Sequence, residues 1–129
     1  MMQNKPVRKR PKNLNLFTIR LPINAVVSIM HRASGMVLFL ILPLLLWCLQ
    51  VSLAHQNGYD HIHLMLNHWL FKLLLIGLSW SFFHHFFAGI RHLAMDVHWM
   101  TSLQKSRFSS RLVIGASMLC VVIFSVWIW

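Results

Sequence analysis

The chain has 129 residues, of which 57% are hydrophobic and only 11% are charged, and its formal net charge is +10. So apolar a composition excludes an ordinary soluble domain. The excess of positive charge raises the question of an acidic partner, and its distribution along the chain decides which kind of partner is favoured.

Three apolar runs are each long enough to form a membrane span. Ala33–Ala54 has 22 residues without Lys, Arg, Asp or Glu, while Leu73–Ile90 and Leu112–Trp129 have 18 each. Roughly 20 apolar residues cross a hydrocarbon core about 30 Å thick, so each run with its flanks predicts one helix. The first run follows a basic arm and has no small-residue cleavage site, so we do not expect a signal peptide. The predicted fold class is an all-α membrane protein with three transmembrane helices.

Positive residues cluster in two segments of the chain. Six lie within residues 1–21, and Lys105, Arg107 and Arg111 lie between the second and third apolar runs, whereas residues 50–69 contain no Lys or Arg. Because positive residues stay on the cytoplasmic side of short loops, we expect a cytoplasmic N-terminus and a C-terminus on the outer side. This rule accounts for the basic arm better than nucleic-acid binding does. We therefore expect membrane lipid, and no nucleic acid, as a partner.

In chain order, residues 1–21 form a basic cytoplasmic arm, and residues 22–129 form the three-helix transmembrane domain. The first helix is predicted from about Pro22, which suits a first helical turn, to Leu53. Pro43 is expected to kink this helix or loosen its outer half, as bilayer helices tolerate when neighbours satisfy the freed carbonyl.

A loop is predicted next, from about Ala54 to His63, where Asn57-Gly58 is a turn signal. The second helix is predicted from about Leu64 to Met95, and the third from about Ser106 to Trp129.

The second helix places several polar residues on one face. His85, Gly89, His92 and Asp96 are separated by four, three and four residues. Glycine beside a histidine lets a flat, bulky group approach the backbone, and an imidazole in a helix core is a suitable axial ligand for haem iron. His92 lies about 10 Å further along the helix, about the reach from a haem iron to its propionates. The alternative is that His85 hydrogen-bonds across the bundle and Arg91 snorkels, and spacing alone leaves both open.

The first helix carries a second polar group at the same predicted depth. His31 and Arg32 enter it from the cytoplasmic side, where cationic and hydrogen-bonding groups can pair with propionate carboxylates. Ser28 and Arg32 are four residues apart and share a face, so a hydroxyl and a guanidinium can donate to the carbonyl of a quinone. The alternative is a serine bonded back to its own helix and an arginine on lipid phosphate.

The remaining histidines leave other function classes open. His61 and His63 can bind a divalent metal weakly, but without Cys or Glu ligands a solvated outer loop is favoured. His84 is about 100° around the helix from His85, so both cannot serve one iron. A small metal transporter using these four histidines is one alternative function, and a structural anchor without a cofactor is another.

Two longer motifs carry a family resemblance. The first comprises Arg10-Pro11-Lys12-Asn13-Leu14, then Pro22, then Ser28-Ile29-Met30-His31-Arg32-Ala33-Ser34-Gly35. The second is His85-x-x-x-Gly89-Ile90-Arg91-His92-Leu93-x-x-Asp96. Together they resemble the cytochrome b membrane-anchor subunit of bacterial succinate dehydrogenase, over residues 9–98. The third helix matches that family only in length and hydrophobicity.

The resemblance implies a subunit of succinate:quinone oxidoreductase (respiratory complex II), multi-pass in the bacterial inner membrane and not catalytic alone. Its implied partners are a second small membrane-anchor subunit, an iron–sulfur subunit and a flavoprotein subunit, with electrons passing from succinate to ubiquinone. His85 is implied as an axial ligand of haem b, opposite a histidine of the second anchor. Ser28, Ile29 and Arg32 are implied in quinone binding. The haem propionate and contact residues are His31, Arg32, Gly89 and His92.

Overall fold

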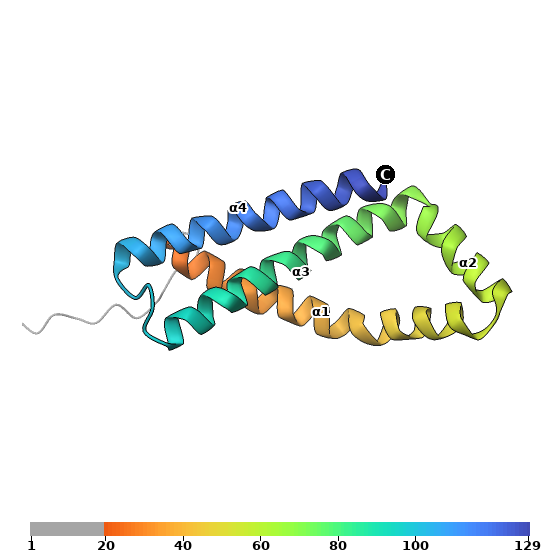
Figure 1. Cartoon of the computed structure of the whole chain (residues 1–129), viewed down its shortest axis with the longest axis horizontal. Helices are drawn as coiled ribbons and strands as arrows, with labels where there is room; N and C mark the ends of the chain where they lie inside the picture. Colours follow the sequence, from red (N-terminus) through yellow and green to blue (C-terminus); the bar gives the residue numbers. More distant parts are fainter. Residues whose placement is uncertain (1–19) are drawn as a thin grey trace, which may run out of the picture.

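The computed structural model describes residues 20–129, which form four α-helices. These are α1 (Ile23–Ala54), α2 (Gln56–Asn67), α3 (Trp69–Asp96) and α4 (Leu103–Ile128) (Figure 1). α1, α3 and α4 are long and apolar enough to cross a membrane, so the three predicted spans are confirmed by length and composition. Of the arm predicted over residues 1–21, all but Arg20 and Leu21 lies outside the described residues.

The loop predicted from Ala54 to His63 is wrong, because most of this segment is helical. α1 ends at Ala54, His55 is extended with φ −153°, and α2 begins at the next residue. Gly58 lies inside α2, where an added Cβ would collide with the backbone carbonyl of Val51 in α1. This glycine therefore serves a close approach of two helices rather than a turn, two uses that look alike in a sequence.

The second predicted helix is divided by a break at His68. This residue is extended, with ψ 136°, and its Nδ1 accepts a hydrogen bond from the backbone N–H of Leu70 at 3.3 Å. A side-chain acceptor at this position satisfies an N–H that has no partner within the helix. α3 therefore begins at Trp69, later than the predicted Leu64, while α4 begins at Leu103, earlier than the predicted Ser106.

α1 passes through Pro43 without interruption of the helix, and its buried residues all precede that proline. Its two fully buried residues are Val27 and Ser34. Beyond Pro43, α1 and α3 diverge, and α2 spans the distance between them (Figure 1). The burial of α1 is consequently concentrated toward the end of the bundle where this helix begins, at Ile23.

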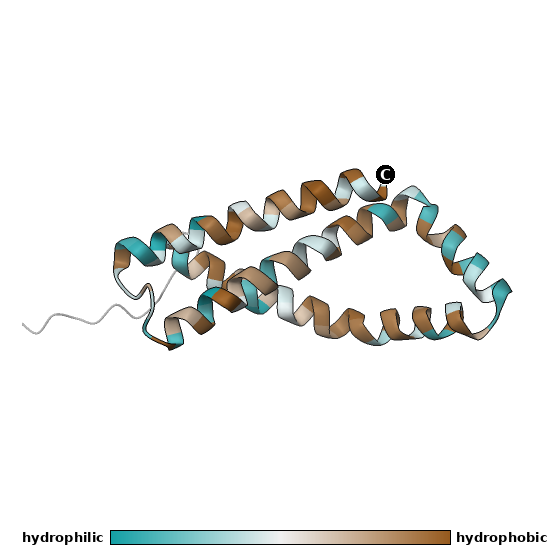
Figure 2. Ribbon diagram, viewed as in Figure 1, coloured by the Kyte–Doolittle hydropathy of each residue, from teal (hydrophilic) through white to brown (hydrophobic). Residues whose placement is uncertain are grey.

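α3 lies between α1 and α4 and contacts both (Figure 1). Val27, Ala88 and Val113, one from each long helix, form the apolar core. Apart from Val113 and Val121, the buried residues of α4 are all serines, namely Ser106, Ser109, Ser110 and Ser117. Small residues let helix backbones approach closely in a bilayer. Many large apolar side chains are exposed instead, as expected of helices that meet lipid or other subunits. Hydrophobic residues are present along all three long helices (Figure 2).

The two ends of the bundle differ in composition. At the end where α1 begins, α3 ends and α4 begins, Arg20, Lys105 and Arg107 are exposed, and we call this the basic end. At the other end, the Lys72 ammonium lies 5.4 Å from the ring centroid of Trp129, a cation–π contact between α3 and the C-terminus. The orientation of the two ends across the membrane stays a prediction.

Candidate functional site

The polar residues of α1 divide between two faces near the basic end. His31 is half-buried and points at α3, whereas Arg32, about 100° further around the helix, is exposed. Ser28, one turn before both, is half-buried, and Ile29 is 53% exposed. Ser28 and Arg32 thus border a surface that is open in the isolated chain, while His31 is directed into the helix interface.

Ser28 differs from most serines of the long helices in its hydrogen bonding. Ser34 and Ser117, for example, donate to carbonyl oxygens of their own helices at 2.9 and 2.6 Å. Within residues 20–129, the Ser28 hydroxyl makes no such bond. The predicted alternative of a serine bonded back to its own helix therefore does not describe Ser28 among these residues, and its O–H is available as a donor.

Three histidines from two helices meet between α1 and α3. The rings of His31 and His85 are stacked, with centroids 4.2 Å apart and planes 7° from parallel. The His92 ring lies 5.0 Å from that of His31, tilted by 46°. We call His31, His85 and His92 the histidine cluster. The sequence predicted His85 and His92 on one helix face, with His31 near the depth of His92, and the structure brings the three rings into contact.

The hydrogen bonds of His85 indicate which of its nitrogens is free. Its Nδ1 lies 3.1 Å from the carbonyl oxygen of His31, which can only accept, so Nδ1 carries the proton and donates. In the neutral ring, Nε2 then keeps its lone pair. A neutral imidazole held in this way is the donor that an axial iron site requires, and His85 is half-buried rather than enclosed. The bond across the bundle is the one that the alternative interpretation predicted for His85. The remaining Nε2 lone pair also fits a haem ligand.

His84 has the opposite environment. It is 0% exposed, stacks on Trp80 with ring centroids 5.3 Å apart, and neither ring nitrogen has a hydrogen-bond partner among the described residues. Because it is enclosed by the helices of this chain, a flat macrocycle cannot reach it without separating them. The adjacent histidines thus point to different surroundings, which their order in the sequence did not reveal.

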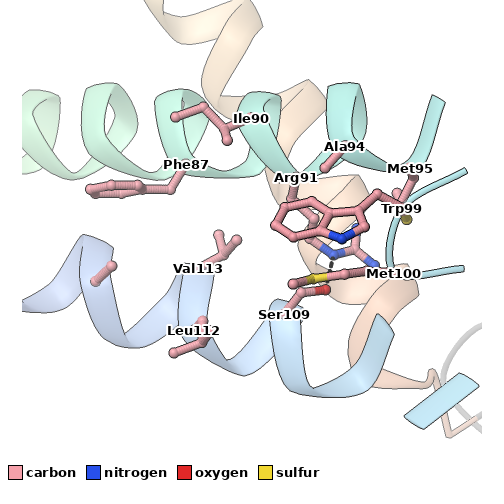
Figure 3. Close-up of a pocket in the computed structure, with 11 residues that line it drawn as sticks. Phe87, Ile90, Arg91, Ala94, Met95, Trp99, Met100, Ser109, Leu112 and Val113 are labelled. Carbon is pink, nitrogen blue, oxygen red and sulfur yellow. Dashed lines mark hydrogen bonds between the residues drawn. The ribbon is translucent and has the colours of Figure 1, made fainter. Parts of the chain in front are cut away.

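Arg91 was predicted, in the alternative interpretation, to snorkel to the interface, and that prediction is wrong. It is 6% exposed, and its Nε and Nη2 donate to the hydroxyls of Ser109 at 3.1 Å and Ser106 at 3.0 Å. These bonds join α3 to α4 beside a pocket of about 190 Å³ that Trp99 and Met100 help to line (Figure 3). The serines at the start of α4 were the signal, since hydroxyls there can satisfy a buried guanidinium.

The histidines of the opposite end do not assemble into a metal site within the described part of the chain. His61 and His63 lie on α2, where residues two apart are about 200° from each other around the helix. Among residues 20–129, no three His, Cys, Asp or Glu side chains are grouped to hold a metal ion. The transporter alternative gains no support from this arrangement.

The fold and the histidine cluster define a three-span helical membrane protein with potential ligand residues on facing helices. A model of the succinate dehydrogenase/fumarate reductase transmembrane subunit family matches residues 6–124, and the chain belongs to this family. The predicted resemblance to cytochrome b membrane-anchor subunits is thereby confirmed.

Individual relatives match over nearly their whole length. The succinate dehydrogenase cytochrome b556 subunit of Coxiella burnetii is 42% identical over 123 residues, which are 94% of this chain and 98% of the relative. The subunits of the same name from Paracoccus denitrificans and Rickettsia felis are 29% and 30% identical, covering 88% and 89% of this chain and 88% and 90% of their own lengths.

Proposed function

We propose that the chain is the haem- and quinone-binding membrane anchor of a bacterial succinate:quinone oxidoreductase. In this role it lies in the inner membrane with its basic end toward the cytoplasm. It assembles with a second small anchor subunit, an iron–sulfur subunit and a flavoprotein subunit, and it is not catalytic alone. The family match supports the complex, and the arrangement around His85 supports the haem.

His85 is proposed as one axial ligand of haem b through Nε2, and the haem supplies one-electron redox chemistry when bound. The observation that carries this assignment is the Nδ1–H bond to the His31 carbonyl oxygen, since it leaves Nε2 as the free donor atom. Histidines that ligate a metal usually donate their other ring N–H to a carbonyl or carboxylate oxygen, which fixes the orientation of the ring. The opposite ligand comes from the second anchor subunit.

The propionate contacts are proposed on the basic-end side of His85. His31 and His92 lie there with ring centroids 5.0 Å apart, and Arg32 follows His31 in α1. Their imidazole N–H groups and the guanidinium can donate to carboxylates in charge-assisted hydrogen bonds. Gly89 lies under the His31 ring, where a Cβ would be 3.6 Å from Nε2, and so belongs to the same contact region.

The quinone site is proposed on the neighbouring face, between Ser28, Ile29 and Arg32. A quinone carbonyl oxygen gains negative charge as it is reduced, and a positioned hydroxyl and cation stabilise that charge. Ser28 offers a donor that is unengaged within residues 20–129, and Ile29, 53% exposed, offers apolar surface for the ring. Arg32 supplies the cation.

The decisive experiment for the haem compares two adjacent substitutions in the purified complex. His85→Leu should abolish or severely alter the reduced b-type absorption band, because the axial donor is lost. His84→Leu, in which the two side chains have similar volumes, should retain the band. The ring that it removes is enclosed, and its nitrogens have no hydrogen-bond partner within residues 20–129. Subunit composition is measured in parallel. A band that survives His85→Leu in an assembled complex, or disappears in His84→Leu, would contradict the assignment.

A further inference from the structure

α1 and α3 contain the same short spacing of histidine and glycine. His31 precedes Gly35 by four residues in α1, and His85 precedes Gly89 by four residues in α3. The helices run in opposite directions (Figure 1), as their order along the chain shows. Each histidine lies over the glycine of the other helix. Both contacts belong to one antiparallel register. The step of four residues from His31 to Gly35 in α1 matches the step of four residues back from Gly89 to His85 in α3.

The two glycines are not equally tight. A Cβ built on Gly35 would lie 2.7 Å from Cε1 of His85, closer than real Cβ atoms approach, and at a tight 3.1 Å from Nδ1. A Cβ on Gly89 would lie 3.6 Å from Nε2 of His31, an ordinary van der Waals contact. The His85 ring therefore occupies space that only glycine leaves free, whereas the His31 ring does not.

Hydrogen bonds hold the His85 ring in that space. The Ser34 hydroxyl donates to the His31 carbonyl oxygen at 2.9 Å, and its oxygen lies 3.4 Å from His85 Nδ1. The same carbonyl oxygen accepts from Nδ1 at 3.1 Å. Since the Ser34 proton is already engaged, both oxygens near Nδ1 act as acceptors, and both favour the tautomer with the proton on Nδ1.

We propose that Gly35, Ser34 and the His31 carbonyl oxygen form a positioning seat, the Gly35 notch, that fixes both the ring rotation and the free nitrogen of His85. This inference rests on the proposed role of His85 as a haem ligand. The notch is a positioning element and not itself a proposed ligand. It acts through His85, because the imidazole plane and the basicity of its Nε2 follow from how Nδ1 and Cε1 are held.

The test uses Gly35→Ala in the complete complex, with two glycine controls on helices of the same chain. At Gly77 and Gly115, a Cβ would meet nothing within 4 Å. We expect Gly35→Ala to displace the low-spin electron paramagnetic resonance signal of the haem and its reduction midpoint. We expect Gly77→Ala and Gly115→Ala to match the wild type, and Gly89→Ala to lie close to them. A wild-type signal and midpoint in Gly35→Ala would overturn the proposal.

Ser34→Ala keeps the test decisive if Gly35→Ala does not assemble. It removes one oxygen beside Nδ1 and little volume, so we expect full haem content with a smaller displacement of the same signal. If Gly35→Ala yields no complex and Ser34→Ala leaves signal and midpoint unchanged, the notch has no positioning role and the proposal is overturned.

A further measurement separates this inference from the proposed function. In the full chain prepared without haem, the ¹⁵N resonances of the His85 ring should report the Nδ1–H tautomer, and Gly35→Ala should shift the tautomer ratio. Suppose that the tautomer is as expected, but the wild-type complex lacks haem or the His85→Leu complex keeps it. Then the proposed haem role is refuted and the notch is not. An Nε2–H tautomer in the wild-type chain refutes the notch, whatever the haem content.

Discussion

One helical turn at the basic end presents a hydroxyl and a guanidinium on the same surface. Arg32→Leu should reduce succinate–quinone turnover by about 10- to 100-fold, because a hydrogen bond to a charged donor contributes about 1.5–3 kcal/mol. Succinate oxidation by an artificial acceptor that takes electrons upstream should change little. Arg32→Lys should restore only part of the turnover, since an ammonium lacks the planar guanidinium fork. Wild-type turnover with quinone in both assembled variants would exclude Arg32 from the site.

Ser28→Ala is a milder change at the same surface. It deletes one neutral donor, a loss of about 1 kcal/mol, and should raise the KM for quinone about fivefold. The haem spectrum should remain that of the wild type, because Ser28 lies one turn from His31 and on the face toward Arg32. Steady-state kinetics over a series of quinone concentrations, with the absorption spectrum as control, measure both effects. An unchanged KM would mean that the hydroxyl has another partner.

At the residue scale, the histidine cluster was predictable but its packing was not. Helical spacing and membrane depth are local properties, so His85 and His92 could be placed on one face from the sequence. The seating of His85 over Gly35 depends on the register between α1 and α3, which no local pattern encodes. For the same reason, the sequence could not show that His84 points into the bundle while His85 meets α1.

At the element scale, α3 and α4 are joined by hydrogen bonds between a buried guanidinium and two hydroxyls. Ser109→Ala removes one of them and leaves the Nε donor of Arg91 without that acceptor. Bonds between membrane helices contribute about 0.6 kcal/mol on average and up to about 1.7. We therefore expect a lower midpoint of thermal inactivation for the solubilised complex.

The matched control for this prediction is Ser125→Ala on the same helix. Its hydroxyl donates only to the Val121 carbonyl oxygen of α4, at 2.7 Å, so no bond between helices is lost. The two variants change the same number of atoms. Equal thermal midpoints would mean that the Arg91 bonds do not stabilise the packing of α3 on α4.

The long helices were predicted well because bilayer thickness sets the length of an apolar run. α2 was missed because its polar residues and Asn57-Gly58 match the composition of a loop. Its boundaries come from the extended residues His55 and His68, and its position comes from the contact between Gly58 and Val51. These features depend on how the helices pack against each other. A turn signal within one segment carries no information about that packing.

At the scale of the whole molecule, the charge distribution predicts an orientation. A reporter that is active only outside the cytoplasm should be active when fused after Trp129 and inactive when fused within residues 97–102. The physical reason is that Lys105, Arg107 and Arg111 resist transfer across the membrane, while residues 50–69 carry no Lys or Arg. The opposite pattern of activities would place the proposed quinone surface on the outer side.

The Gly35 notch also has a consequence for the length of the chain. Since the register of α1 and α3 is held where His85 meets Gly35, the connection over residues 55–68 need not define it. Insertions near His68 should leave His85 where it is, so we expect this connection to accept a tag. One residue inserted between His31 and Gly35 would instead rotate Gly35 by about 100° around the axis of α1, away from His85.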